Sequence, residues 1–508
     1  MRWSRFSSWT IRGCWWSTTS AWHGDAPWRY RSTGWKRRAN VLRLPLDPVL
    51  SKSQSRSFKP SGGCRHQSTV NETHDPAARS WVSSANDPAS DFPIQNLPFG
   101  VFSRHGDEPP GVGIAIGDQI LDVAACHRAE LFAGRSAAAA GACIGASLNA
   151  LLAREPEEWS ALRHALHLLL RADRPARDQA LMEQALVPMR EATVHLPIAI
   201  GDYTDFYASH FHAMNLGRMW RPDNPLLPNY KFVPVGYNAR ASSVVVSGTP
   251  VARPHGQAMP NPDGCPTFGP TNALDYEVEL GFVVGGGNGI GEPIPIGQAH
   301  RHLFGVCLVN DWSARDVQRW EYQPLGPFLG KSFLTSISPW IVTLEALEPY
   351  RVPAFARPAG DPAPLPYLSD ARDMEQGGVA LTLEVFLSSA AMRRAGMPPF
   401  GLSRGQVADM YWTPAQLIAH HTSNGCNLRP GDLLASGTIS GADKASRGCL
   451  LEIAWRGTEP ITLPTGESRR FLEDEDEVIL RGYAARPGAA RIGLGQCRGV
   501  VTPRSLEG

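Results

Sequence analysis

Apolar and polar residues alternate in two different ways along the chain after the first eighty residues. In the run VGIAIGDQILDVA the alternation turns around at Gly117-Asp118, which predicts a β-hairpin with a tight turn. Further on, apolar residues from Trp159 to Leu169 recur at helical spacing and predict an amphipathic helix. We therefore expect a small domain over residues 81–197 that contains a hairpin and helices, and its patterns carry no chemistry.

Residues 198–508 consist of short apolar runs separated by Gly and Pro, which predicts a β-rich roll with few helices. The clearest strand is Val306–Val309, an apolar and partly β-branched run. Asp311 follows where this strand ends. A carboxylate at the end of a buried strand is a candidate site residue.

The segment after Asp311, Ser313–Tyr322, has helical character. On a helix, Arg315, Gln318 and Tyr322 stand at i, i+3 and i+7 and project from one face. Cationic, amide and phenolic groups beside a carboxylate indicate a site, whereas composition alone would favour a solvated strand–helix unit.

Composition narrows the class of protein. With 508 residues the chain exceeds a single typical core, so we expect two domains plus additional segments. A net charge of +1 argues against a nucleic-acid surface, and no apolar run is long enough to span a membrane. The nine cysteines form no CxxC pairs, which favours reduced thiols in an intracellular compartment. We expect a cytoplasmic protein.

Residues 1–80 do not resemble the remainder. They are rich in Ser, Arg and Trp, and Asp25 and Asp47 are the only acids before Glu72. We expect an unstructured extension, of the kind that an over-long translation start produces. Organelle targeting is the first alternative, and a basic nucleic-acid-binding arm with interleaved aromatic residues is the second.

Two acidic residues suggest a cation site. Strict alternation in ALDYEVELGFVVG places Glu277 and Glu279 on one strand face. Paired carboxylates repel unless a cation lies between them or water surrounds both, and the apolar residues that follow favour the cation. Oxygen ligands select Ca²⁺ or Mg²⁺. An exposed edge strand is the alternative.

Other polar residues allow more than one interpretation. Asp205 and His212 stand seven apart, which is one face of a helix if GDYTDFYASHFHAMNLGRMWRP is helical, and His210 competes with His212. Glu452 lies within the apolar run GCLLEIAW, which reads as a strand, so its carboxylate needs a buried partner. The run LEDEDEV near the end predicts an exposed acidic turn.

Long motifs then resemble one family. GDYTDFY, PVGY…RASSVVVSGTP, DYEVEL, NDWSARDVQRWEYQPLGPFLGKSF and NGCNLRPGDLLASGTISG are similar to segments of the fumarylacetoacetate hydrolase family. The resemblance runs from about Asp91 to the C-terminus. It implies a mainly β fold with an N-terminal SH3-like barrel domain, a C-terminal mixed β-roll (198–508) and assembly as a homodimer.

The resemblance also implies roles for individual residues. Those matching Ca²⁺ ligands are Asp205, Glu277, Glu279 and Asp311, and those matching positions around Mg²⁺ are Asp311, Lys331 and Thr335. His212, not His210, matches the general base, and Glu452 matches the carboxylate that orients it. The oxyanion-stabilising donors are matched by Arg315, Gln318 and Lys331. Substrate contacts match Tyr207, Arg221, Gln318, Tyr322 and Thr438. Asn238, Ala239 and Leu334 depart from the family pattern and bear on loop geometry.

The implied reaction is hydrolysis of the carbon–carbon bond of fumarylacetoacetate to fumarate and acetoacetate, the last step of tyrosine and phenylalanine catabolism. The implied partner is this small molecule, without nucleic acid or membrane. Alternatives are an acylpyruvate hydrolase or an oxaloacetate decarboxylase of the same superfamily, and an inactive metal-binding scaffold. The N-terminal domain and the implied His212/Glu452 pair argue against both superfamily alternatives, since a decarboxylase needs no activated water.

Overall fold

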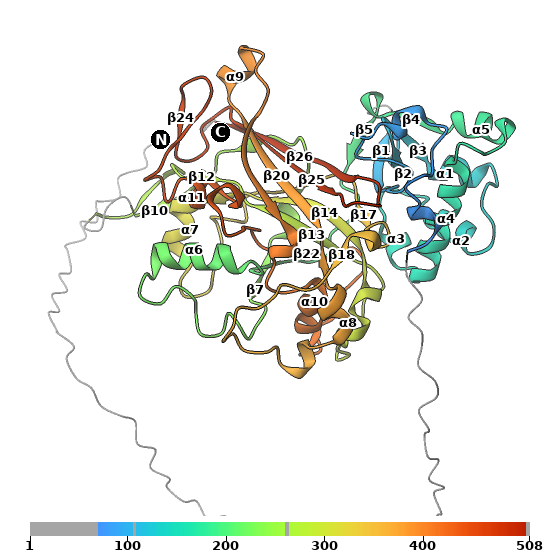
Figure 1. The fold of residues 1–508 in the computed structure, drawn as a ribbon. Helices are drawn as coiled ribbons and strands as arrows, with labels where there is room; N and C mark the ends of the chain where they lie inside the picture. Colours follow the sequence, from blue (N-terminus) through green and yellow to red (C-terminus); the bar gives the residue numbers. More distant parts are fainter. Residues whose placement is uncertain (1–69, 105–107, 260–263, 504–508) are drawn as a thin grey trace, which may run out of the picture. The chain divides into compact units, whose positions relative to one another are not determined.

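The β-branched and apolar runs of the sequence form a set of sheets that dominates the chain (Figure 1). The computed structural model describes residues 70–104, 108–259 and 264–503. Most of the predicted N-terminal extension, residues 1–69, lies outside the described residues. The three largest sheets have eight, five and five strands. The predicted mainly β fold class is confirmed.

The N-terminal region contains the predicted hairpin and the predicted amphipathic helix. Strands β2 (Gly111–Ile116) and β3 (Gln119–Asp122) pair antiparallel, and Gly117 takes a φ of +59° at the turn between them. Helix α4 (Pro156–Leu170) buries its apolar stripe. The remaining elements of this region are β1 (Phe99–Ser103), β4 (Leu186–Pro188), β5 (Thr193–His195), α1 (Val123–Arg128), α2 (Gly134–Gly141), α3 (Asn149–Leu152) and α5 (Ala176–Glu183).

The eight-stranded sheet holds most of the predicted site residues. Its order is β7-β6-β22-β13-β14-β16-β8, and β17 pairs with β14 beside this path. The predicted strand Val306–Val309 forms the centre of β14, and Asp311 ends it. The strands are β6 (Tyr203–Phe206), β7 (Gly236–Ala239), β8 (Val244–Val246), β13 (Val278–Val284), β14 (Leu303–Asp311), β16 (Thr335–Ile337), β17 (Val342–Thr343) and β22 (Leu433–Ala435).

A second five-stranded sheet covers one face of the eight-stranded sheet, and Figure 1 shows its long central strands β20, β25 and β26. Leu280 and Phe282 of β13 join an apolar cluster with residues of this second sheet. Val283 points to the opposite face, where it joins a cluster with Phe99 and Leu162 of the N-terminal region. The second sheet consists of β9 (Val251–Ala252), β20 (Leu381–Ser388), β21 (Phe400–Gln406), β25 (Glu477–Ala484) and β26 (Ile492–Thr502).

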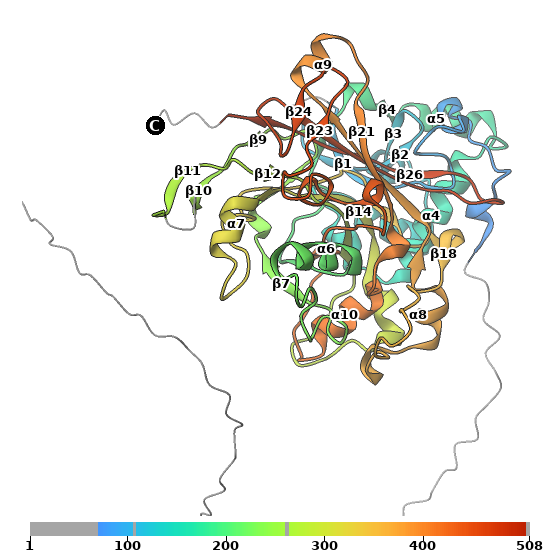
Figure 2. The same ribbon diagram turned by 60° about the vertical axis from the view of Figure 1, so that its left-hand side comes forward.

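Helices α6 (His210–Trp220) and α7 (Arg315–Glu321) lie next to each other in both views (Figure 2). The rings of Trp220 and Tyr322 lie 5.8 Å apart at the ends of these helices. The remaining elements are β10 (His255–Ala258), β11 (Thr267–Pro270), β12 (Leu274–Asp275), β15 (Ser313–Ala314), β18 (Arg351–Val352), β19 (Gly378–Val379), β23 (Ile461–Thr462), β24 (Ser468–Arg469), α8 (Ala371–Gln376), α9 (Ala390–Arg394), α10 (Pro414–Thr422) and α11 (Leu450–Ile453).

Residues 70–80 correct the predicted boundary of the extension. Thr73, His74 and Ser80 are buried. The Asn71 side chain donates to Glu345 Oε1 at 3.0 Å, and the Ser80 hydroxyl donates to the Leu170 carbonyl at 2.9 Å. These residues therefore belong to the packed structure rather than to an unstructured extension.

None of the helices in the described ranges has the length and apolar character that crossing a membrane requires.

Candidate active site

Three carboxylates from different strands of the eight-stranded sheet lie close together. Asp205 lies on β6, Glu279 on β13 and Asp311 at the end of β14. Each offers a carboxylate oxygen within 4.8 Å of the other two, and all three side chains are buried. Strand pairing through β22 brings Asp205 to the others, because Ala435 of β22 pairs with both Asp205 and Gly281.

The electrostatics of this cluster favour a bound cation. Burial raises the pKa of Glu279 and of Asp205 well above the usual range, and the neighbouring carboxylates raise both further. Burial also raises the pKa of Asp311, although the Lys331 ammonium opposes this shift. Crowded buried carboxylates ionise readily only when positive charge lies among them.

Several oxygens of the cluster also lack a hydrogen-bond partner in the part of the chain that the structure describes, and they are free to bind a ligand. Within the described residues, both carboxylate oxygens of Glu279 and Oδ1 of Asp205 are buried without a hydrogen-bond partner. Buried polar atoms normally have a partner, so these three oxygens are candidates for coordination. Carboxylate oxygens are what Ca²⁺ and Mg²⁺ prefer. Thr335 completes this side of the cluster, since its hydroxyl donates to Asp311 Oδ1 at 2.9 Å.

Glu277, the fourth predicted metal ligand, is paired with side-chain cations. It lies between β12 and β13, one residue before β13 begins at Val278. Its Oε1 accepts from Arg315 Nη1 at 2.6 Å, and its Oε2 accepts from Lys331 Nζ. Burial alone would raise the pKa of Glu277, but Lys331 and Arg315 outweigh it and hold this pKa well below the usual range. Its role as a metal ligand stays a prediction.

Lys331 links Glu277 to the carboxylate cluster. Its Nζ donates to Asp311 Oδ2 at 2.5 Å as well as to Glu277. Burial would lower the pKa of Lys331, but Asp311 and Glu277 outweigh it and raise this pKa. The ammonium is therefore charged, and it connects Glu277 to Asp311 of the carboxylate cluster.

The Arg315 guanidinium is held by several acceptors at once. Nε donates to Asp275 Oδ2 at 2.9 Å, and Nη1 donates to Glu277 and to Gln318 Oε1 at 3.1 Å. Nη2 is buried and has no hydrogen-bond partner among the described residues. The predicted shared face of Arg315 and Gln318 on a helix is confirmed by this contact, and Tyr322 forms the C-cap of the same helix.

His212 and Glu452 form a buried pair. His212 Nδ1 lies 2.6 Å from Glu452 Oε2. Glu452 also accepts from Asn215 and Ser440, each at 2.8 Å. Burial opposes ionisation of Glu452, but His212 and these donors outweigh it and lower its pKa to about 2. The expected buried partner of Glu452 is thus found.

Two local predictions about this pair are wrong. Glu452 lies in the short helix α11, not in a strand. The apolar run around it is buried on all sides, so its sequence has no periodicity that distinguishes a helix from a strand. Asp205 and His212 do not share a helix: Asp205 lies on β6, and His212 lies on α6, which begins at His210 after the Ser209 cap.

His210 points elsewhere. Its ring stacks on Tyr411 at 5.7 Å, and burial lowers its pKa. The ring of Tyr207, by contrast, meets that of His212 edge-on at 5.3 Å. The structure therefore separates the two histidines, and only His212 lies with the predicted site residues.

Family models match the two parts of the chain. The model described as fumarylacetoacetate hydrolase C-terminal matches residues 203–502, and the one described as fumarylacetoacetase N-terminal matches residues 95–197. The chain belongs to the fumarylacetoacetate hydrolase family. The matched ranges include every predicted site residue.

The chain matches curated relatives in this family over nearly the whole length of those relatives. Fumarylacetoacetase of Homo sapiens is 48% identical over 431 residues, which is 84% of this chain and 99% of that protein. Fumarylacetoacetase of Oryza sativa is 47% identical over 431 residues, 84% of this chain and 97% of that protein. A solved fumarylacetoacetate hydrolase from Exiguobacterium antarcticum covers 80% of this chain and all of its own at 16% identity, with a TM-score of 0.43, too distant for comparing residues.

The predicted substrate contacts of this family member lie on several elements. Tyr207 touches His212, and Tyr322 lies against Trp220. Arg221 caps α6 and donates to the Pro225 carbonyl at 3.2 Å. The Thr438 hydroxyl is buried without a partner in the part of the chain that the structure describes, so it can accept or donate a hydrogen bond.

Sequence reasoning missed four polar residues that contact the site. Asp275 holds Arg315, and Asn215 and Ser440 hold Glu452. The Tyr237 hydroxyl lies 3.5 Å from Asp311 Oδ2. Asp275 opens the DYEVEL motif and Asn215 follows His212 by three residues, so helical and strand spacing could have indicated both. Nothing local indicates Ser440.

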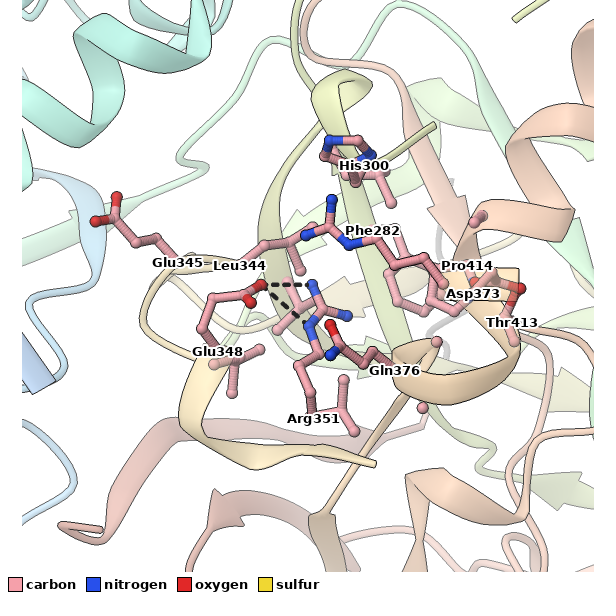
Figure 3. A pocket seen from close by; sticks show the side chains of 18 of the residues that line it. Phe282, His300, Leu344, Glu345, Glu348, Arg351, Asp373, Gln376, Thr413 and Pro414 are labelled. Carbon is pink, nitrogen blue, oxygen red and sulfur yellow. Dashed lines mark hydrogen bonds and ion pairs between the residues drawn. The ribbon is translucent and has the colours of Figure 1, made fainter. Parts of the chain in front are cut away.

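Two cavities lie near the central sheet, and the larger is not the one beside the carboxylates. A cavity of about 380 Å³ is lined by Leu280 and Phe282, on the face of β13 opposite Glu279, and Figure 3 shows its Glu348–Arg351 ion pair. Among the described residues, no predicted site residue lines it. A cavity of about 200 Å³ is lined by Tyr203, Tyr237, Asn238, Ala239, Asp311, Lys331 and Thr335. The smaller cavity therefore adjoins the site.

Proposed function

We propose that this protein hydrolyses the carbon–carbon bond of 4-fumarylacetoacetate, which yields fumarate and acetoacetate, as in the last step of tyrosine and phenylalanine catabolism. The observation that carries this proposal is 48% identity to a fumarylacetoacetase over 99% of that enzyme. The buried Asp205–Glu279–Asp311 cluster and the His212–Glu452 pair support it. The buried His212–Glu452 pair supports hydrolysis over decarboxylation, since only hydrolysis needs activated water.

His212 acts as the general base. Its Nδ1 faces Glu452, so Nε2 is the nitrogen that takes a proton from water. Glu452 keeps the ring oriented and stabilises the imidazolium that forms. The hydroxide adds to the ketone carbonyl of the fumaroyl group, whose carbon becomes the new carboxyl carbon of fumarate. Collapse of the adduct breaks the carbon–carbon bond, fumarate leaves as the acid product, and the acetoacetate enolate takes a proton back.

Arg315, Gln318 and Lys331 stabilise the oxyanion of the adduct. Arg315 offers Nη2, its one buried nitrogen without a partner in the described chain, and Lys331 offers a charged ammonium beside Asp311. Fixed donors of this kind stabilise charge that develops in the transition state. Tyr207, Arg221, Tyr322 and Thr438 hold the remainder of the substrate.

We propose that Asp205, Glu279 and Asp311, with Glu277 beside them, hold Ca²⁺ or Mg²⁺. The partnerless oxygens of Glu279 and Asp205 support a hard cation in this place. Thr335, whose hydroxyl donates to Asp311, would be a further ligand of Mg²⁺. Lys331 would contribute a main-chain oxygen because an ammonium cannot ligate a cation. When bound, the cation would polarise the substrate carbonyl as a Lewis acid.

We propose a homodimer as the assembled form. Exposed apolar side chains support it: Leu325 is 95% exposed, and Phe328 and Leu329 beside it are also exposed. These residues lie in the loop that joins Tyr322 to Lys331, so a second copy that covers them would also fix two site residues. Light scattering of wild type and Leu325→Glu tests this, and a wild-type monomer contradicts it.

We also propose a cytoplasmic location, with organelle targeting by residues 1–69 as the alternative. Localising the tagged full chain tests this.

The test of the reaction is turnover of fumarylacetoacetate beside acetylpyruvate and oxaloacetate, with and without chelator. We expect preferential cleavage of fumarylacetoacetate that chelator abolishes and added Mg²⁺ or Ca²⁺ restores. Preferential turnover of acetylpyruvate or oxaloacetate would replace the proposed reaction by one of the two alternatives. Metal binding without turnover of any of the three would leave an inactive scaffold.

A further inference from the structure

Asp275 is a fully buried carboxylate that the catalytic steps described above do not use. Its side chain is 0% exposed. Oδ2 accepts from Arg315 Nε at 2.9 Å and from the Leu451 backbone N–H at 3.0 Å. Oδ1 accepts from the backbone N–H groups of Leu450 at 2.8 Å and Tyr276 at 2.9 Å. Four donors thus converge on one carboxylate.

The first consequence concerns Arg315. A guanidinium can present any of three nitrogens, and its orientation decides which. Asp275 takes Nε, and Glu277 with Gln318 takes Nη1, so Nη2 is left as the buried nitrogen that has no partner among the described residues. Asp275 therefore selects the nitrogen that Arg315 presents to an incoming oxygen.

The second consequence concerns Glu452. Helix α11 carries Glu452, and its N-cap residue Cys449 makes no side-chain capping bond to the backbone. Asp275 supplies the missing acceptor from a distant part of the chain, since it binds the first two N–H groups of α11. A carboxylate at this end of a helix fixes the helix start and so the position of Glu452 against His212.

We infer that Asp275 is a positioning residue. It holds the oxyanion donor Arg315 and the general-base pair His212–Glu452 at fixed positions relative to each other. The inference rests on the proposed hydrolysis. It adds that one side chain, Asp275, positions both the oxyanion donor and the general-base pair. Asp275 itself touches neither substrate nor metal. It acts through Arg315 and through α11.

Steady-state kinetics of the full-length enzyme with added Mg²⁺ test this. Asp275→Asn keeps the size but cannot accept four hydrogen bonds, because one amide position donates. We expect kcat to fall roughly a hundredfold, as for loss of an oxyanion donor, while KM changes by less than about threefold, as for an interaction made in the transition state. Asp275→Glu keeps the charge but shifts its place, so we expect it also to lower kcat.

Asp476→Asn is the matched control. Asp476 is another buried carboxylate that holds an arginine, with Arg469 Nε at 2.8 Å, and it also accepts a backbone N–H from Glu473. Its loss should lower the melting temperature and leave kcat unchanged. A merely structural Asp275 would behave like this control, with a lower melting temperature and wild-type kcat.

A double-variant cycle separates positioning from general damage. In the Arg315→Gln background, Asp275→Asn should lower kcat by less than about tenfold further, because part of its effect passes through Arg315. Full additivity of the two losses would overturn the inference. So would wild-type kcat in Asp275→Asn, or failure of both Asp275 variants to fold while Asp476→Asn folds, which would assign Asp275 to stability.

The same assays distinguish a failure of the Asp275 inference from a failure of the proposed reaction. If the wild type cleaves acetylpyruvate but not fumarylacetoacetate, the proposed substrate is wrong, and the Asp275 comparison is made on acetylpyruvate with the same expected ratios. A wild-type protein inert towards acetylpyruvate, oxaloacetate and fumarylacetoacetate would overturn both.

Discussion

His212 Nδ1 lies 2.6 Å from Glu452 Oε2, and both side chains are almost completely buried. A buried carboxylate against one imidazole nitrogen fixes which nitrogen is left for proton transfer. It also distinguishes His212 from His210, whose ring stacks on Tyr411. The choice between two nearby histidines thus follows from their partners.

We expect His212→Ala to lower kcat by roughly two to four orders of magnitude, the usual cost of losing a general base. His210→Ala, two residues away on the same helix, is the control and should change kcat far less. The measurement is steady-state turnover of fumarylacetoacetate at saturating substrate. Equal losses in the two variants would contradict the assignment of the base.

Arg315→Lys should lower kcat with only a modest change in KM. A lysine ammonium cannot reach Asp275, Glu277 and Gln318 at once while also presenting a further donor, because the planar fork is lost. Loss of kcat at nearly constant KM is typical of a contact made in the transition state. A variant changed only in KM would instead make Arg315 a substrate anchor.

Glu279→Gln should weaken metal binding and activity together, and added Ca²⁺ or Mg²⁺ should partly restore activity. The amide keeps one oxygen ligand, but the cluster loses one negative charge. Calorimetric titration with the metal measures the affinity. Wild-type affinity in this variant would mean that the cation site lies elsewhere. Asp476→Asn, which changes a buried acid outside the cluster, is the control.

The same substitution has a pH-dependent effect on the metal-free protein. Burial and neighbouring carboxylates raise the pKa of Glu279, so the folded state binds its proton more tightly than the unfolded state does. Stability from such a group is present below the unfolded pKa of about 4.3 and is lost as pH rises towards the folded pKa. Glu279→Gln should therefore gain stability over wild type as pH rises above this value. Thermal melts in chelator across pH measure the difference, and a pH-independent difference would refute the cause.

Local patterns were sufficient for elements whose signal lies within the element. The strand up to Asp311, the hairpin at Gly117 and the helical face shared by Arg315 and Gln318 all appear as expected. Each depends on side-chain periodicity over a few consecutive residues, which the sequence contains in full.

Features set by distant partners could not be read locally. The apolar neighbours of Glu452 have no helical period and predict a strand, whereas Glu452 lies in α11, whose first N–H donates to Asp275. The run LEDEDEV predicts an exposed acidic turn, and residues 473–475 are exposed as predicted. Asp476 in the same run is 1% exposed because Arg469 pairs with it. In each case the deciding contact comes from outside the motif.

The remaining prediction compares two truncations that differ by eleven residues. Deletion of residues 1–69 should leave activity and melting temperature essentially unchanged, because that segment precedes every motif. Deletion of residues 1–80 should lower the melting temperature, because it removes the buried Thr73, His74 and Ser80 and takes one side-chain hydrogen-bond donor from Glu345 and one from Leu170. The loss should spread to the helix α4 that Leu170 ends. Differential scanning calorimetry and turnover of both truncations test this. Equal stability of the two proteins would return the boundary to residue 80, and a large loss on removing 1–69 alone would show that the leading segment contributes to the fold.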